Sequence, residues 1–202
     1  MLNLEIEIKN IKFFNKGKRS LVYTGKFKNK KVGIKIKNPK SLAKSRIENE
    51  GKFLKILNKY NIGPKIIRSK KDYVVYKFIE GKPFIEELPK VNKTDKIKLI
   101  LSVLDQCRTL DKLKINKLEF TRPIKHLYIK NKKVKMIDFE RCYFTKSPKN
   151  ITQFCNFLIS KKMNKILKIN KEDLIKILKE YKKNQTEENY KLIKKLIKIS
   201  EN

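Results

Sequence analysis

Residues 127–142 read LYIKNKKVKMIDFERC, and this stretch decides the fold that the sequence predicts. Two β-prone runs, 127–129 and 134–137, flank a polar segment without apolar side chains, a pattern typical of a hairpin. The second run leads directly into Asp138, which stands between two apolar residues. A carboxylate buried in such surroundings requires a cationic partner or a metal ion. An aspartate at the end of a strand can also simply cap a turn, and this stretch alone does not decide between the two.

Length and composition limit the class of protein. The chain has 202 residues, of which 40% are hydrophobic, enough for the core of one sizeable domain or two small lobes. This composition excludes a disordered tail. The formal net charge of +33 results from 53 Lys and Arg residues against 20 Asp and Glu residues. Such a charge predicts a polyanion partner such as RNA, but lysine enrichment from AT-biased coding or heat adaptation would produce the same charge.

Cysteine spacing and apolar runs exclude further classes. The three cysteines show no Cys-x-x-Cys spacing and the chain has one histidine, so neither a disulfide framework nor a zinc site is expected. No apolar run approaches the roughly 18 residues of a membrane span. Glu5 and Glu7 occupy the region where a signal peptide would be apolar, and we therefore expect a cytoplasmic protein without a membrane partner.

Five strands are expected in the first part of the chain. Leu2, Leu4, Ile6 and Ile8 alternate with polar residues, so a half-buried strand should begin here and its β-like composition continues over 11–14. The segment 15–25, a turn that contains Gly17, joins this strand to a second one that ends before a turn at 28–31; the backbone N–H groups of the Gly17 turn could hold a phosphate, although most such turns are only hairpins. Further strands are expected at 32–36, 66–67 and 73–79, which completes a five-stranded pattern.

A helix is expected over 41–60, ending at 61–64, where Gly63 suits a left-handed cap. Its apolar residues fall at three- and four-residue spacing, and Glu50 lies on this apolar face while Glu48 lies on the other side. An acid on a core-facing stripe needs a partner, and Lys35 in the preceding strand is the nearest candidate. The alternative is that Glu50 extends to solvent at the edge of the helix.

The second part of the chain reads as mostly helical. A domain boundary is expected after Gly81, which separates residues 1–81 from residues 82–202. Asn92–Asp95 offers N-caps for a long helix, and another helix should run over 150–161. The predicted fold class is therefore α+β, with a five-stranded antiparallel sheet and one helix followed by a reduced, mostly helical lobe.

The hairpin that runs into Asp138 and Phe139 resembles the metal-binding segment of protein kinases, whose Asp-Phe-Gly motif holds magnesium against the ATP phosphates. Glu140 stands where that family has glycine. The turn with Gly17 resembles a degenerate glycine-rich loop, and Val-Gly-Ile-Lys at 32–35 resembles the strand that carries the phosphate-binding lysine. The resemblance implies that Lys35 contacts the α- and β-phosphates and that Glu50 forms the ion pair that places it.

The run at 73–81, YVVYKFIEG, resembles the strand and hinge between the two lobes of a kinase. By that resemblance, the carbonyl of Lys77 and the N–H of Ile79 would hydrogen-bond the adenine ring. The cofactors that the resemblance implies are thus ATP and magnesium.

The segment 118–126 departs from the His-x-Asp catalytic loop of the family. Counting back from Asp138 places His126 at the position of the metal-binding asparagine and Thr121 at that of the aspartate. Glu119 is then the only carboxylate near enough to act as a base and orient the acceptor hydroxyl, and Lys125 or His126 would face the γ-phosphate. Magnesium prefers oxygen ligands, so His126 is a doubtful metal ligand that could equally just pack at the end of the loop.

Residues 11–160 resemble the reduced kinases of the RIO type and the small kinase of the KEOPS assembly, because an activation segment and an Ala-Pro-Glu motif are absent. The segments Glu-x-x-x-Pro-x-Lys-His and Ile-Asp-Phe-Glu-Arg resemble a family of small archaeal predicted serine/threonine kinases. This resemblance implies a two-lobed kinase-like fold and an atypical ATP-dependent serine/threonine protein kinase with an unknown protein acceptor. The alternatives are a pseudokinase scaffold and a module that binds RNA without sequence specificity.

Overall fold

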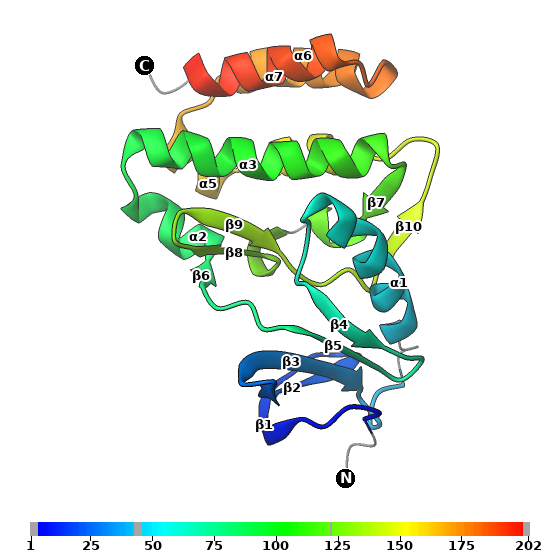
Figure 1. The fold of residues 1–202 in the computed structure, drawn as a ribbon. Helices are drawn as coiled ribbons and strands as arrows, with labels where there is room; N and C mark the ends of the chain where they lie inside the picture. The colour runs from blue at the N-terminus through cyan, green and yellow to red at the C-terminus, as the bar shows by residue number, and fades with distance from the viewer. Residues whose placement is uncertain (1–3, 43–45, 122, 200–202) are drawn as a thin grey trace. The chain divides into compact units, whose positions relative to one another are not determined.

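The computed structural model describes residues 4–42, 46–121 and 123–199, and it is an α+β structure (Figure 1). The chain divides into two compact units. The first unit runs to Glu80 and takes in Lys135–Cys142, and the second comprises Gly81–Val134 and the chain from Tyr143 onward. The segment around Asp138 therefore belongs to the unit formed by the first part of the chain.

The first unit contains a five-stranded antiparallel sheet, as the sequence predicts. Its strands lie in the order β1-β2-β3-β5-β4, so the fifth strand is inserted between the third and the fourth. In the register of the central pair, Lys35 lies opposite Val74 and Ile34 opposite Val75. The strand bounds are β1 Lys9–Lys16, β2 Ser20–Phe27, β3 Lys30–Lys37, β4 Ile66–Ser69 and β5 Tyr73–Lys77.

One face of this sheet is covered by the N-terminal segment. The buried residues Val32, Ile34, Tyr73 and Val75 form the core, and Leu4, Ile6 and Ile8 are among the half-buried residues that pack against them. Residues 4–8 pack without joining the sheet, and β1 begins only at Lys9. The strand predicted from residue 2 is therefore wrong over 4–8, because here the alternation serves packing across the face of the sheet; Leu2 lies outside the described residues.

The other face carries helix α1, Ile47–Leu57, followed by a short 3-10 helix, Asn58–Tyr60 (Figure 1). The helix begins later than predicted, since Asn38 accepts the backbone N–H groups of Lys40 and Ser41 in a turn; residues 43–45 lie outside the described part. The predicted end is confirmed, with left-handed backbone at Asn61 (φ 58°) and at Gly63 (φ 79°).

Short strands also occur in the chain after Glu80. The predicted hairpin is confirmed as β8, Leu127–Lys130, and β9, Lys133–Met136, which form a sheet in the order β6-β8-β9 with β6, Lys82–Pro83. Asn131 and Lys132 have φ values of 49° and 56°, as in the tight turns that suit the twist of a hairpin. A second small sheet pairs β7, Ile115–Lys117, with β10, Cys142–Phe144.

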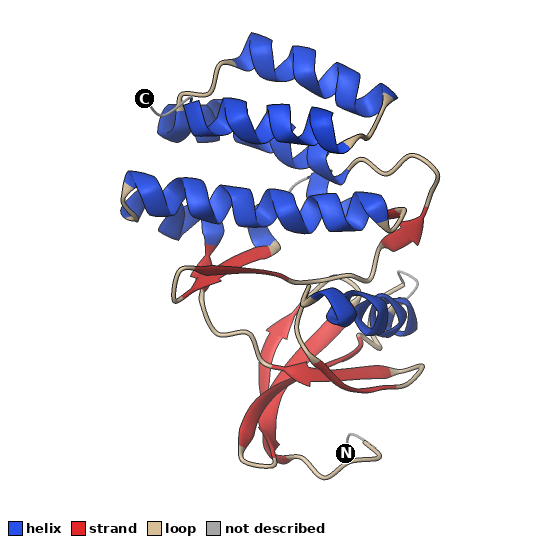
Figure 2. Cartoon of the chain, turned by 45° about the horizontal axis from the view of Figure 1, so that its top comes forward, coloured by secondary structure: helices blue, strands red, loops and turns tan. Residues whose placement is uncertain are grey.

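Among the described residues, six α-helices belong to the second unit, and Figure 2 draws the helices of the chain in blue. The side chain of Asn92 accepts a hydrogen bond from the backbone N–H of Asp95, which confirms the predicted N-cap of α3. The helix predicted over 150–161 ends earlier, and a separate helix follows it. The bounds are α2 Phe84–Glu87, α3 Lys93–Lys112, α4 Asn150–Leu158, α5 Lys161–Leu167, α6 Lys171–Lys183 and α7 Glu187–Ile199. Three short 3-10 helices span Leu88–Lys90, Leu118–Thr121 and Pro123–Lys125.

The helices were compared with the length and apolar composition of a membrane span. No helix within the described ranges has both the length and the apolar composition that crossing a membrane requires.

A buried polar network joins three helices of the second unit. The carboxylate of Asp111 on α3 accepts hydrogen bonds from Asn150 Nδ2 at 2.7 Å on α4 and from the Tyr181 hydroxyl at 3.0 Å on α6. Arg108 donates to the same hydroxyl at 3.0 Å. A buried carboxylate is stable only with such partners, so this network fixes α4 and α6 against α3.

We expect Asp111→Ala to lower the free energy of unfolding by about 3 kcal/mol, because the substitution leaves the Asn150 amide and the Tyr181 hydroxyl buried without their acceptor. Urea unfolding followed by circular dichroism measures the loss. The matched control is Asp72→Ala in an exposed turn, which should cost less than about 0.5 kcal/mol. Equal stability of the two variants would contradict the role of the network.

Candidate functional site

Strand β3 brings a lysine into the interior of the first unit. The alternation of the strand points Val32 and Ile34 into the core described above, so Lys35 points to the opposite face, toward α1. Its side chain is only 7% exposed. Gly33 is required on this face because a Cβ atom there would lie 2.5 Å from the ring of Tyr76 on the neighbouring strand. The glycine in Val-Gly-Ile-Lys thus makes room for a tyrosine beside the lysine.

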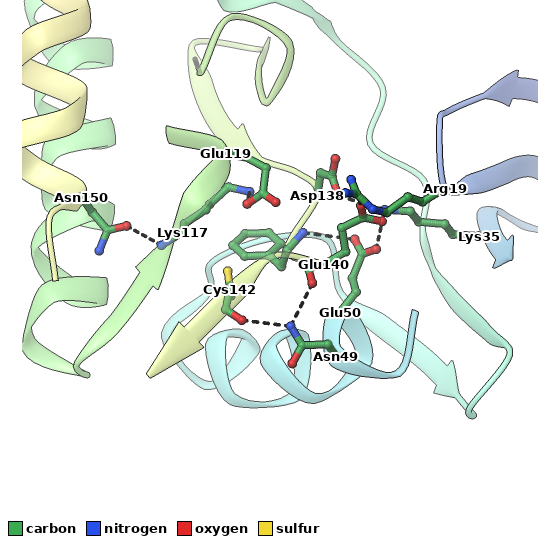
Figure 3. Close-up of polar contacts among 11 residues, drawn as sticks. Arg19, Lys35, Asn49, Glu50, Lys117, Glu119, Asp138, Glu140, Cys142 and Asn150 are labelled. Atoms are coloured by element: carbon green, nitrogen blue, oxygen red, sulfur yellow. Dashed lines mark hydrogen bonds and ion pairs between the residues drawn. The ribbon is translucent and has the colours of Figure 1, made fainter. Parts of the chain in front are cut away.

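Three carboxylates surround the ammonium group of Lys35 (Figure 3). Its Nζ lies 2.6 Å from Glu50 Oε2, 2.9 Å from Asp138 Oδ1 and 3.2 Å from Glu140 Oε2. The ion pair expected between Lys35 and Glu50 is present, and the cation that Asp138 was expected to need is the same lysine. Of these three contacts, the one with Asp138 is a hydrogen bond, whereas Glu50 and Glu140 hold the ammonium as ion pairs.

Helix α1 holds the segment that carries Asp138 and Glu140. The side chain of Asn49 donates to the backbone carbonyls of Glu140 and Cys142, both at 2.9 Å, and Glu50 Oε1 accepts the N–H of Phe139 at 3.3 Å. Asp138 itself has left-handed backbone, with φ 63°, which few residues other than glycine adopt without cost. Two consecutive residues of one helix turn therefore fix a strained segment that directs both of its acids at Lys35.

Electrostatics keep the lysine charged. Burial alone would lower the pKa of the Lys35 ammonium, but the negative charges of Glu50, Asp138 and Glu140 hold this pKa well above its ordinary value. Burial raises the pKa of the Glu50 carboxyl above its ordinary value, and the charge of Lys35 opposes that shift. Lys35 is thus a permanent cation at neutral pH.

The cluster carries more negative than positive charge. Arg19 is the second cation, with its guanidinium 3.8 Å from Glu140 Oε1, and it is partly exposed. Three carboxylates face these two cations, so one negative charge is in excess when all groups are ionised. Ligand atoms of Glu50, Asp138 and Glu140 lie within 4.8 Å of one another. An all-oxygen donor set of this kind fits magnesium, a hard cation that prefers carboxylates.

The other residues predicted to bind a cofactor in the first unit are positioned by backbone contacts. The N–H of Gly17 donates to the Ser20 carbonyl at 2.8 Å and closes the turn between β1 and β2. The N–H of Lys77 is taken by the Lys65 carbonyl at 2.8 Å. Within the part of the chain that the structure describes, the N–H of Ile79 donates to no backbone carbonyl. Adenine binding by Lys77 and Ile79 stays a prediction.

Glu119, Lys125 and His126 belong to the second unit. The side chain of Glu119 is only 4% exposed, with Oε2 3.2 Å from the ammonium of the fully buried Lys117. Its other oxygen, Oε1, meets no hydrogen-bond donor among the residues described. Lys125 is exposed and His126 is half-buried, with its backbone N–H donating to the Pro123 carbonyl at 2.9 Å. The role of base thus stays a prediction, and it requires that the Glu119 carboxylate become accessible.

Sequence reasoning missed three residues of this cluster. The sequence pattern marks Glu140 only as a substitute for the expected glycine, and it marks neither Arg19 nor Asn49. Glu140 lies two residues beyond Asp138, with one apolar residue between them. This spacing could have indicated Glu140, because two acids so placed can share one cationic partner. Asn49 and Arg19 gave no signal in a chain with so many polar and basic residues.

Comparison with known proteins does not identify the chain. No family model matches the sequence, and no curated protein matches it either. The functional argument therefore depends on the residues of the site.

Removal of the lysine should destabilise the first unit more than removal of one of its acids. Lys35→Met leaves three carboxylates facing one another with Arg19 as their remaining cation, and should cost about 3–5 kcal/mol of unfolding free energy. Glu140→Gln leaves Lys35 with two carboxylates, and should cost about 1 kcal/mol or less. Denaturant unfolding of both variants measures the difference. The account is wrong if the two losses are equal, or if adding Glu140→Gln to Lys35→Met brings no recovery.

Proposed function

We propose that the chain is an atypical ATP- and magnesium-dependent phosphotransferase with a kinase-like fold, of the kind seen in small archaeal predicted serine/threonine kinases. The observation that carries this proposal is the ammonium of Lys35, held at 2.6 Å by Glu50 and at 2.9 Å by Asp138. A strand lysine, a helix glutamate and an aspartate after a hairpin are the groups that phosphate and metal recognition needs in a kinase. These three come from distant parts of the sequence and meet at one point.

The arrangement of the sheet supports the same proposal. The strand order β1-β2-β3-β5-β4, with a helix directly after β3, agrees with the architecture that the sequence resemblance implies for a nucleotide-binding lobe. The backbone of Lys77 and Ile79 lies just after β5, next to the strand that carries Lys35. Adenine would hydrogen-bond to these two residues, and the phosphates would extend to Lys35 and to the turn at Gly17.

Asp138, with Glu50 beside it, would hold magnesium. A magnesium ion in this position would supply positive charge to the phosphate oxygens of the nucleotide. The chain's own contribution is the fixed charge of Lys35, which Glu50 orients and keeps protonated. Phosphoryl transfer depends mainly on positioning and charge neutralisation, so a well-fixed cation provides much of the required stabilisation.

Glu140 restrains this site in the state that the structure describes. Three carboxylate oxygens lie within 3.2 Å of the Lys35 ammonium, so a phosphate can reach the ammonium only if one carboxylate withdraws. Glu50 is fixed by Phe139 and Asp138 is needed for the metal, whereas Glu140 has Arg19 as a second partner. We therefore assign the withdrawal to Glu140.

Nucleotide affinity should respond to Lys35 and Glu140 in opposite directions. Lys35→Ala removes a charged phosphate contact worth about 1.5–3 kcal/mol, whereas Glu140→Gln should tighten binding at least about threefold because it removes a competing charge. Calorimetry with ATP and magnesium measures both changes. Lys37→Ala is the matched control, an exposed lysine two residues along the same strand, and should bind like the parent. Unchanged affinity in Lys35→Ala, with its folding verified by circular dichroism, would refute the assignment.

Phosphoryl transfer is tested separately with ATP labelled in its γ-phosphate and a generic protein acceptor. We expect Asp138→Asn to abolish transfer, because it removes the carboxylate assigned to the metal, and Glu119→Gln to slow transfer roughly 10²-fold if Glu119 is the base. Asp72→Asn, in an exposed turn, controls for a contaminating kinase and should remain active. Label transfer that survives in Asp138→Asn would exclude this site.

The burial of Glu119 favours a second candidate function. A carboxylate that is only 4% exposed and bound to Lys117 cannot accept a proton from a dissolved acceptor in this conformation. The chain would then bind nucleotide as a pseudokinase scaffold without transferring phosphate. The two functions differ in outcome, because the scaffold binds ATP through Lys35 but gives no labelled acceptor.

A further inference from the structure

The second unit contains a lysine-lined cavity that the proposed phosphotransferase site does not use. The cavity has a volume of about 310 Å³, near the lower end of the roughly 300–1,000 Å³ of ligand pockets. Four lysines line it, together with hydroxyl and amide side chains and no acid. The lining residues are Lys114, Lys146, Ser147, Lys182, Lys183, Asn184, Gln185 and Thr186.

Three separate segments form the walls, and hydrogen bonds hold them together. The turn after α3 supplies Lys114, whose carbonyl accepts the N–H of Thr145 at 2.8 Å. The turn between α6 and α7 supplies Gln185, which donates to the Pro148 carbonyl at 2.7 Å. The segment after β10 is thus tied to both of the other walls, and the cavity is a product of the fold.

The lysines of this cavity lack local compensation. Within the described ranges, Lys114, Lys146 and Lys182 form no ion pair, and Lys183 has only an exposed pair with Glu180 at 3.0 Å. Glu187, the acid next to the lining in sequence, is already 3.0 Å from Lys112. Lysines in the last turn of a helix are stabilised by the partial negative charge of its C-terminal carbonyl groups, which accounts for Lys182 and Lys183. Lys146 lies in a loop, where this stabilisation does not apply. The cavity therefore has a surplus of positive charge without an internal partner.

The chemistry of the lining selects among possible anions. Ammonium, hydroxyl and amide groups all donate hydrogen bonds, which suits phosphate oxygens. No aromatic or aliphatic side chain lines the cavity, so it offers neither an apolar anchor for a protein partner nor a stacking surface for a base. We infer that this cavity binds the phosphate backbone of a single-stranded nucleic acid, as an electrostatic site without sequence specificity. The net charge of +33 provides the long-range attraction, and the cavity provides the point of attachment.

The test compares two triple variants of the full chain with equal loss of charge. One replaces Lys114, Lys146 and Lys182 with Gln; the control replaces Lys161, Lys162 and Lys165 with Gln, which are exposed on α5 and line no part of the cavity. Fluorescence anisotropy with a labelled oligouridylate of about 12 nucleotides gives the affinity at several salt concentrations.

We expect the cavity variant to bind the oligonucleotide at least tenfold more weakly than the parent at an ionic strength of about 0.1 M. The slope of log affinity against log salt should fall by about 2, at about 0.7 per lost phosphate contact on a single strand. The control variant should lose less than about threefold and keep its slope.

Four results would overturn the inference. Equal losses in the two variants would mean that binding is diffuse, and unchanged binding in the cavity variant would mean that the phosphates contact another surface. An equal loss of affinity for oligoglutamate of the same charge would show a site for acidic protein instead. A further titration with inorganic phosphate separates the ligand sources: it should not displace the oligonucleotide at millimolar concentration, and displacement would assign the cavity to a free phosphate.

Discussion

The ammonium group of Lys35 compensates three carboxylates in the interior of the first unit, and the local structure of that unit depends on this compensation. Buried charges are costly unless they are paired. Here one cation on a strand pairs with an acid on a helix and with two acids on the strained segment after a hairpin. Glu50 and Asn49 of α1 meet both the lysine and the backbone of 138–142. The position of α1 on the sheet is therefore coupled to the position of Asp138.

The same interaction explains why the site is both rigid and restrained. An ammonium held by three carboxylates is well placed, but a further anion can approach it only when one carboxylate leaves. Glu140 makes one of these three contacts and also has Arg19 as a partner, so it is the carboxylate that can leave Lys35 without losing its only cation.

Part of this site could be predicted from the sequence. Glu50 followed from the helical period and Lys35 from the strand that precedes it, and Asp138 from its apolar neighbours after a hairpin; each of these signals is local. Glu140 and Arg19 could not be predicted in the same way, because their contacts depend on where the segment after the hairpin turns. The left-handed backbone of Asp138 decides that direction, and a single aspartate in a sequence does not reveal it.

The fold likewise has parts that local sequence patterns predict and parts that they do not. The five strands and the caps at Asn92 and Gly63 follow from local patterns, whereas the segment 4–8 has the alternation of a strand and nevertheless packs across the sheet face. The lysine cavity could not be predicted because its walls come from three segments between residues 114 and 186, in a chain with lysines throughout.

A crystal structure of the chain with manganese and a non-hydrolysable ATP analogue tests the central claim most directly. Anomalous scattering locates manganese, and the account predicts it on the Asp138 carboxylate, with a phosphate oxygen on Lys35 and with Glu140 withdrawn. A nucleotide bound elsewhere, with Lys35 still held by all three carboxylates, would contradict the claim that this lysine is a phosphate-binding group.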